Sequence, residues 1–156
     1  MKYQELVDVY SALENTTKRL EKTEIISDFL LKLDSTTLEQ VGLLILGSVF
    51  PAWSDKEIGI GNKLVMQAVG EAVGVTPDKV EDAVRDHGDI GLACISLYAK
   101  KSQTTFFSQP LTIDFVFKSL RKLSEKSGAR STKRKIDIIL EMLSQASASE
   151  AKYLTR

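Results

Sequence analysis

The chain has few of the residues from which most catalytic and metal sites are built. It contains one cysteine, one histidine and one tryptophan among 156 residues. A single cysteine excludes an internal disulfide bond and fits a reducing compartment. One cysteine and one histidine also cannot supply the usual Cys/His ligand set of a zinc site. The composition therefore argues against a disulfide-stabilised or zinc-dependent protein.

Long apolar runs are also missing. No segment approaches the roughly 18 apolar residues of a membrane span, and the chain starts Met-Lys-Tyr-Gln-Glu-Leu, without the apolar core of a signal peptide. Apolar content of 43% and charged content of 27% are ordinary for a globular protein. We therefore expect residues 1–156 to form a single cytoplasmic domain that has no membrane partner.

Strand signals are scarce, because no segment shows sustained apolar/polar alternation between hairpin turns. Helical periodicity dominates instead: apolar residues recur at i, i+3, i+4 and i+7 from Leu6, Ile26, Val65 and Ile136. We predict the all-α fold class, as a compact multi-helix domain of about nine to ten short helices. Their expected ranges are 3–15, 18–33, 37–48, 55–59, 62–73, 77–87, 89–100, 111–126, 132–145 and 148 to the end.

Helix start and stop signals support these ranges. Three segments fit the capping box, in which a hydroxyl and a carboxylate satisfy each other's backbone N–H groups. They are Thr36–Glu39, Ser54–Glu57 and Ser147–Glu150. Gly88 and Gly128 are expected to end helices. Between two helices, the aromatic residues of Phe50-Pro51-Ala52-Trp53 are expected to anchor a connector to the core.

Net charge is zero, but the charges are segregated along the chain. Residues 1–117 hold 11 Lys+Arg against 17 Asp+Glu, whereas residues 118–156 hold 10 against 4. Such a directed field favours a polyanion at one end of the molecule. Charge alone leaves open a solvated basic helix face with no partner.

The densest basic segment is Ser-Gly-Ala-Arg-Ser-Thr-Lys-Arg-Lys, at residues 127–135. A glycine ends one helix there, a hydroxyl residue opens the next, and four basic residues crowd the junction. The first turn of a helix carries free N–H groups and a partial positive charge, so it is a natural seat for a phosphate. This segment predicts nucleic-acid binding.

No catalytic residue stands out. His87 is expected at a helix end, in a capping or surface role, and Cys94 lies in an apolar helix, as a small core residue. Lys135-Ile-Asp137 lacks the glycine of the Lys-x-Asp-Gly motif of nucleotidyl transferases and falls on an amphipathic helix, so it is rejected as an active site. Gly59-Ile-Gly61 lacks the Gly-Lys-Ser/Thr ending of a phosphate loop. It either marks a close approach of backbones or exposes N–H groups to a ligand beside Lys63.

Four stretches in register resemble the N-terminal DNA-binding domain of archaeal and eukaryotic ATP-dependent DNA ligases. They are Glu57–Leu64, Asp86–Gly91, Ser127–Asp137 and Glu150–Arg156. The resemblance implies an all-helical domain that lies along the minor groove of nicked duplex DNA in replication, repair and recombination. The adenylation domain of the family, with its Lys-x-Asp-Gly, would follow residue 156. The chain is thus expected to be a monomeric fragment without a cofactor, and ATP and Mg²⁺ belong to the parent ligase.

In this family the DNA-facing surface is made largely by glycine-containing turns and helix starts. The resemblance and the basic helix start together give the expected DNA-binding residues. They are Gly59, Gly61, Asn62, Lys63, Gly88, Gly91, Ser127, Gly128, Arg130, Ser131, Thr132, Lys133 and Arg134. Arg130 departs from the small residue that the family often has at this position.

A second likeness is Gln103-Thr-Thr-Phe106-Phe107, which resembles the short peptide with which archaeal ligases bind the sliding clamp, PCNA. Two adjacent aromatic residues on a polar loop are typical of interface anchors. The segment lacks the aliphatic position of the full clamp-binding box. Two alternatives remain: the chain is a protein-interaction adaptor that docks through Gln103, Phe106 and Phe107, or both phenylalanines pack in the core of the domain.

Overall fold

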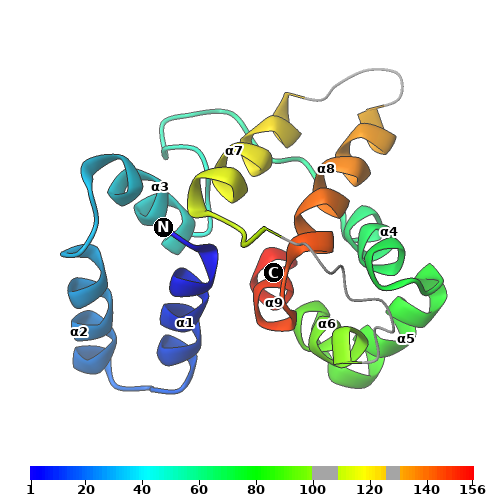
Figure 1. The fold of residues 1–156 in the computed structure, drawn as a ribbon, viewed down its shortest axis with the longest axis horizontal. Coiled ribbons are helices and arrows are strands. Elements are labelled where there is room, and N and C mark those ends of the chain that lie inside the picture. The colour runs from blue at the N-terminus through cyan, green and yellow to red at the C-terminus, as the bar shows by residue number, and fades with distance from the viewer. Residues whose placement is uncertain (100–108, 126–130) are drawn as a thin grey trace.

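The computed structural model describes residues 1–99, 109–125 and 131–156, and these ranges contain nine α-helices and no strand (Figure 1). The all-α prediction is confirmed. The helices are α1 (Tyr3–Glu14), α2 (Arg19–Leu30), α3 (Ser35–Ile45), α4 (Asn62–Val73), α5 (Pro77–His87), α6 (Ile90–Ala99), α7 (Ile113–Ser124), α8 (Ser131–Gln145) and α9 (Ala148–Leu154).

The helices are arranged around α7, α8 and α9. Helix α4 packs along α8, α6 packs against α9, and α3 packs against α7. Figure 1 shows α1 and α2 side by side on the left of the view, with α4, α5 and α6 on the right. None of the helices in the described ranges is both long and apolar enough to cross a membrane.

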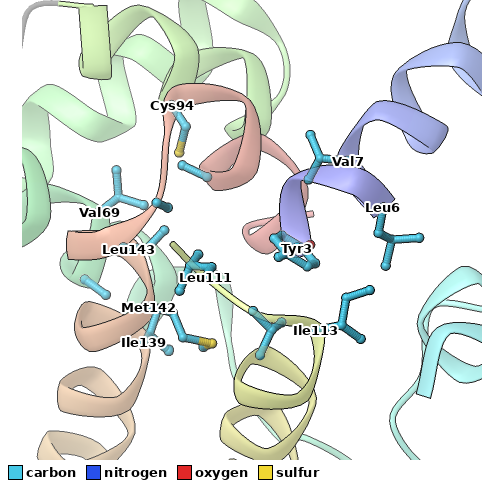
Figure 2. Packing of buried hydrophobic residues seen from close by; sticks show 14 of the residues in the cluster. Tyr3, Leu6, Val7, Val69, Cys94, Leu111, Ile113, Ile139, Met142 and Leu143 are labelled. Carbon is cyan, nitrogen blue, oxygen red and sulfur yellow. The ribbon is translucent and has the colours of Figure 1, made fainter. Parts of the chain in front are cut away.

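The main core lies where α1, α7, α8 and α9 meet (Figure 2). Leu6, Leu111 and Leu143 are fully or almost fully buried there. The predicted apolar stripe that starts at Ile136 therefore faces the core. The stripe that starts at Ile26 does so only in part, because α2 lies at the edge of the molecule and buries only Phe29.

The start of the chain is tied to the segment before α7. The backbone N–H of Tyr3 donates to the carbonyl of Leu111 at 2.8 Å, and that of Ile113 donates to the carbonyl of Met1 at 3.2 Å. Lys2 and Thr112 thereby form an isolated antiparallel bridge. Because these bonds join opposite parts of the sequence, they fix α1 against α7.

Helix caps were predicted correctly at some positions and wrongly at others. Ser147 and Glu150 form the predicted capping box, and Gly88 ends α5 in the left-handed conformation, with φ of 73°. The predicted box at Thr36 is wrong: Asp34 precedes α3, and its carboxylate accepts from the N–H groups of Thr36 and Thr37 at 3.0 and 3.1 Å. A carboxylate two residues earlier reaches both free amides first.

The connection between α3 and α4 holds two further corrections. Residues 55–59 form no helix, because Gly59 adopts φ of 61° and so interrupts the short polar segment that was expected to form one. Phe50 is buried as predicted, but Trp53 is 87% exposed and anchors nothing. Of the two aromatic residues, only Phe50 holds this connection to α7, in a small buried cluster with Val49 and Phe117.

Candidate nucleic-acid interface

The first turn of α8 presents cations to solvent. Arg134 is exposed on the side of the helix opposite the apolar stripe, and Lys133 is exposed at its flank, while Ile136 and Ile139 of the stripe are buried in the core. The sequence produces this arrangement because the basic residues precede the apolar stripe and lie off its face. Thr132 is exposed in the same turn, and Ser131 begins the helix half-buried.

A side-chain bond joins this helix start to the glycine turn before α4. The ammonium Nζ of Lys135 donates to the carbonyl oxygen of Gly59 at 2.8 Å. Gly59 has a positive φ of 61°, a backbone conformation that would be strained for a residue with a side chain. The structure therefore brings together the two segments that sequence reasoning had placed in one site.

Helix α4 begins at this turn with open amides. Gly61 precedes the helix in an extended conformation, and no side chain caps it. A Cβ atom at Gly61 would meet nothing within 4 Å, and Asn62 and Lys63 are exposed. The start of α4 can therefore accept an anion from solvent, through free N–H groups and the positive end of the helix dipole.

The starts of α4 and α8 lie on the same side of the molecule. The two helices pack along each other, and Figure 1 shows α8 running downward from the upper right of the view with α4 beside it at mid-height on the right. The Lys135–Gly59 bond confirms that their N-terminal ends are close. The arrangement places the open amides of α4 beside the exposed cations of α8, where phosphate oxygens could bind.

Helix α7 contributes cations that the sequence interpretation did not name as site residues. Arg121 and Lys122 are exposed near its C-terminal end, and the Arg121 guanidinium lies 5.3 Å from the Phe50 ring centroid and 5.4 Å from that of Phe117. The segregation of charge along the chain was the signal that could have found them. Two exposed carboxylates, Asp55 and Glu57, lie on the connection that passes this helix.

The start of α6 has a different environment. The Asp89 carboxylate accepts from the N–H of Leu92 at 2.9 Å and pairs with Arg156 at 2.8 Å, and the Arg156 guanidinium holds the pKa of Asp89 below its ordinary value. Gly91 is buried, and a Cβ atom there would lie 2.7 Å from the carbonyl oxygen of Lys152. At this helix start a carboxylate and helix α9 already occupy the space around the amides.

The Gly88 and Gly91 corner is therefore separate from the α4–α8 site. Figure 1 shows α5 and α6 in the lower part of the view, whereas α8 starts at the upper right. The stretch from Glu150 to Arg156 also has structural bonds: Lys152 and Arg156 both pair with Glu14 at the end of α1. Hydrogen bonds from Lys152, and then from Tyr153 and Arg156, lower the pKa of the Glu14 carboxyl.

The remaining candidates fall into two groups. Predicted residues that lie outside the described ranges are Gln103, Phe106, Phe107, Ser127, Gly128 and Arg130. Cys94 is fully buried, as predicted, and burial raises the pKa of its thiol, while His87 is exposed at the end of α5. In the described part of the chain, no three His, Cys, Asp or Glu side chains gather where they could hold a metal ion.

Comparison with known proteins identifies relatives over the whole length of the chain. A family model described as DNA ligase N terminus matches residues 2–156. The chain is 97% identical to a DNA ligase of Methanobrevibacter smithii over 100% of its length. It is 53% identical to a DNA ligase of Methanothermobacter thermautotrophicus over 99% of its length. A DNA ligase of Thermococcus onnurineus is 44% identical over 100% of the chain. In each comparison the chain spans 28% of the length of the relative.

Proposed function

This chain belongs to the DNA ligase N-terminal family, and from that premise we propose that it is the DNA-binding module of an ATP-dependent DNA ligase. As a monomer it binds nicked duplex DNA, independently of sequence, along the minor groove. The observation that carries the proposal is the bond between Lys135 and Gly59, which joins two helix starts into one cationic surface.

Phosphate contacts explain why such binding does not depend on sequence. Each Lys or Arg that neutralises a phosphate releases a condensed counterion, and the free amides at a helix start add directed donors. Lys63, Lys133 and Arg134 supply the charge here, and the starts of α4 and α8 supply the amides. We assign Gly91 to packing against α9 and Gly88 to ending α5, rather than to this surface.

The chemistry of strand joining lies, in this proposal, in the rest of the ligase. The chain spans only 28% of its relatives, and ATP and Mg²⁺ are assigned to the parts of the parent enzyme that it does not include. Residues of this chain position the nick without touching the reacting atoms. The protein would act at the nucleoid, in replication, repair and recombination.

Salt dependence of binding tests the proposal. Fluorescence anisotropy with labelled nicked, intact and single-stranded DNA, at several salt concentrations, measures the affinity and its slope. Lys133→Ala and Arg134→Ala should each weaken binding to any duplex and reduce the slope by roughly one unit per lost contact. Lys32→Ala, which removes an exposed cation beyond α2, is the matched control and should leave the slope unchanged. Affinity that stays flat between low and moderate salt would contradict the proposal.

The second candidate function is docking on the sliding clamp through Gln103, Phe106 and Phe107. The sequence pattern of two adjacent aromatics after a glutamine supports it. A paired Phe106→Ala and Phe107→Ala variant should lose calorimetric binding to a purified sliding clamp and keep its DNA affinity. A variant that binds the clamp as tightly as the unmodified chain rules out this role. The two functions are compatible, because tethering to a clamp raises the effective concentration of DNA.

A further inference from the structure

Trp53 is the most exposed large apolar side chain in the described ranges. It is 87% exposed, and it is also the only tryptophan in the chain. Tryptophan is highly buried on average in folded proteins, because its ring removes a large apolar area from water. The exposed indole of Trp53 is therefore a candidate for contact with a molecule outside this domain.

The backbone that carries Trp53 is anchored before the ring and closed into a turn after it. Three residues earlier, Phe50 is buried against α7, and the Ser48 hydroxyl bonds to both its N–H and its carbonyl, at 3.1 and 2.8 Å. On the other side, the N–H of Ser54 donates to the carbonyl of Pro51 at 2.9 Å, which closes a turn around Trp53. The exposed ring therefore projects from a fixed turn.

This turn follows a residue that contacts a cation of α7. Arg121 lies over the Phe50 ring, and three Cα–Cα steps place Trp53 within about 11 Å of Phe50. Further along the same connection, Gly59 accepts the bond from Lys135. Figure 1 shows the connection from α3 to α4 beginning to the left of α7, passing behind it and reaching α4 on the right, where α4 lies beside α8. The segment that carries Trp53 thus runs from the cations of α7 to those of α8.

We propose that Trp53 is a DNA-contacting residue, whose indole ring packs on the sugars and base edges of the minor groove between the phosphates that the cations hold. This proposal rests on the proposed function. Proteins that bind this groove combine cations with apolar side chains placed against base steps, and the indole N–H can donate to the acceptors on the groove floor. The connection and the end of α7 expose Lys56, Arg121 and Lys122, together with the carboxylates Asp55, Glu57 and Glu125. Lys135, which reaches Gly59 on the same connection, adds a fourth cation. This cationic excess favours a duplex over an apolar protein partner.

The single tryptophan gives a direct readout of the contact. Its emission, excited at the red edge of its absorption so that tyrosines contribute little, should be quenched when unlabelled nicked duplex is added. Anisotropy of a fluorescein-labelled duplex measures binding independently of the tryptophan. Trp53→Ala should weaken duplex binding by about fivefold or more, and Trp53→Phe should recover part of the loss, since stacking depends on an aromatic face.

Two controls separate contact from folding. Trp53→Ala should keep the thermal midpoint of the unmodified chain, because a side chain that is 87% exposed contributes little to the core. Leu20→Ala removes a side chain that is 83% exposed on α2, away from the cationic surface, and should leave DNA affinity unchanged.

Each outcome has a defined meaning. Quenching together with the affinity loss supports the inference. Salt-dependent binding with unchanged emission and an unchanged affinity of Trp53→Ala overturns the inference and leaves the proposed function standing. Absence of binding to any DNA overturns both. Emission that changes on adding a sliding clamp, and not on adding DNA, assigns the ring to a protein contact and overturns the inference.

Discussion

Replacing Gly91 by alanine should destabilise this domain, although the same change in an isolated helix is stabilising. Gly91 is buried in the first turn of α6, against the C-terminal helix α9. An added Cβ atom would lie 2.7 Å from the carbonyl oxygen of Lys152, 2.9 Å from Nε of Arg156 and 3.0 Å from Cγ of Lys152. Real Cβ atoms essentially never approach other atoms so closely, so the backbone of α9 must move.

The expected size of the effect follows from two opposing contributions. Alanine is favoured over glycine by up to about 1 kcal/mol in a helix interior. Inserting a methyl group into a filled contact costs about 1–3 kcal/mol, and the upper part of that range applies when a backbone atom has to yield. The free energy of unfolding should therefore fall by about 1–2 kcal/mol. For a domain of this size the thermal midpoint should fall by roughly 2–8 °C.

Thermal and urea denaturation followed by circular dichroism measure this change, and Gly42→Ala is the matched control. Gly42 lies inside α3, and a Cβ atom there would meet nothing within 4 Å. This variant should be more stable than the unmodified chain by up to about 1 kcal/mol. If Gly91→Ala is as stable as the unmodified chain or more stable, the packing role of Gly91 is refuted. Loss of DNA affinity in Gly91→Ala without any loss of stability would instead place Gly91 on the DNA surface.

Two further predictions concern local bonds. Asp34→Ala should lower the stability measured by urea denaturation, because it removes the cap of α3, whereas Thr36→Ala should lower it clearly less. An equal loss would contradict this assignment of the cap. Lys152 and Arg156 hold the pKa of Glu14 below its ordinary value of 4.5, so the stabilisation is full above pH 4.5 and disappears as the pH falls through the lower native value. Glu14→Gln should therefore lower the thermal midpoint near pH 7, and its difference from the unmodified chain should shrink below about pH 4.5; a pH-independent difference would contradict the ion pairs.

Helices with a strong apolar period and clear caps could be predicted from the sequence. The expected ranges 62–73 and 77–87 coincide with α4 and α5, because glycine or proline marks their boundaries. An apolar stripe was predicted to be buried along α2, but Phe29 is the only residue of that helix that the structure buries. Periodicity cannot tell how much of a face receives a partner, and α2 lies at the edge of the fold.

The candidate site likewise has one part that the sequence predicts and another that only the fold shows. The start of α8 could be predicted from charge, because Lys133 and Arg134 adjoin each other in sequence and precede an apolar stripe. The Lys135–Gly59 bond could not be predicted, since it joins residues 76 positions apart and depends on the packing of α4 along α8. The packing role of Gly91 depends likewise on α9. Sequence patterns show what a segment offers locally, and only the fold shows which distant segment it meets.

The bonds between α1 and the last residues of the chain have a consequence for biosynthesis. Ser11 bonds to Tyr153, and Glu14 pairs with Lys152 and Arg156, so α1, once synthesised, finds these partners only after about 140 more residues have been added. At roughly 5–20 residues per second, that delay is on the order of ten to thirty seconds. Throughout this interval the apolar side chains of α1, including Leu6 and Val7, lack their final neighbours and stay open to non-native contacts.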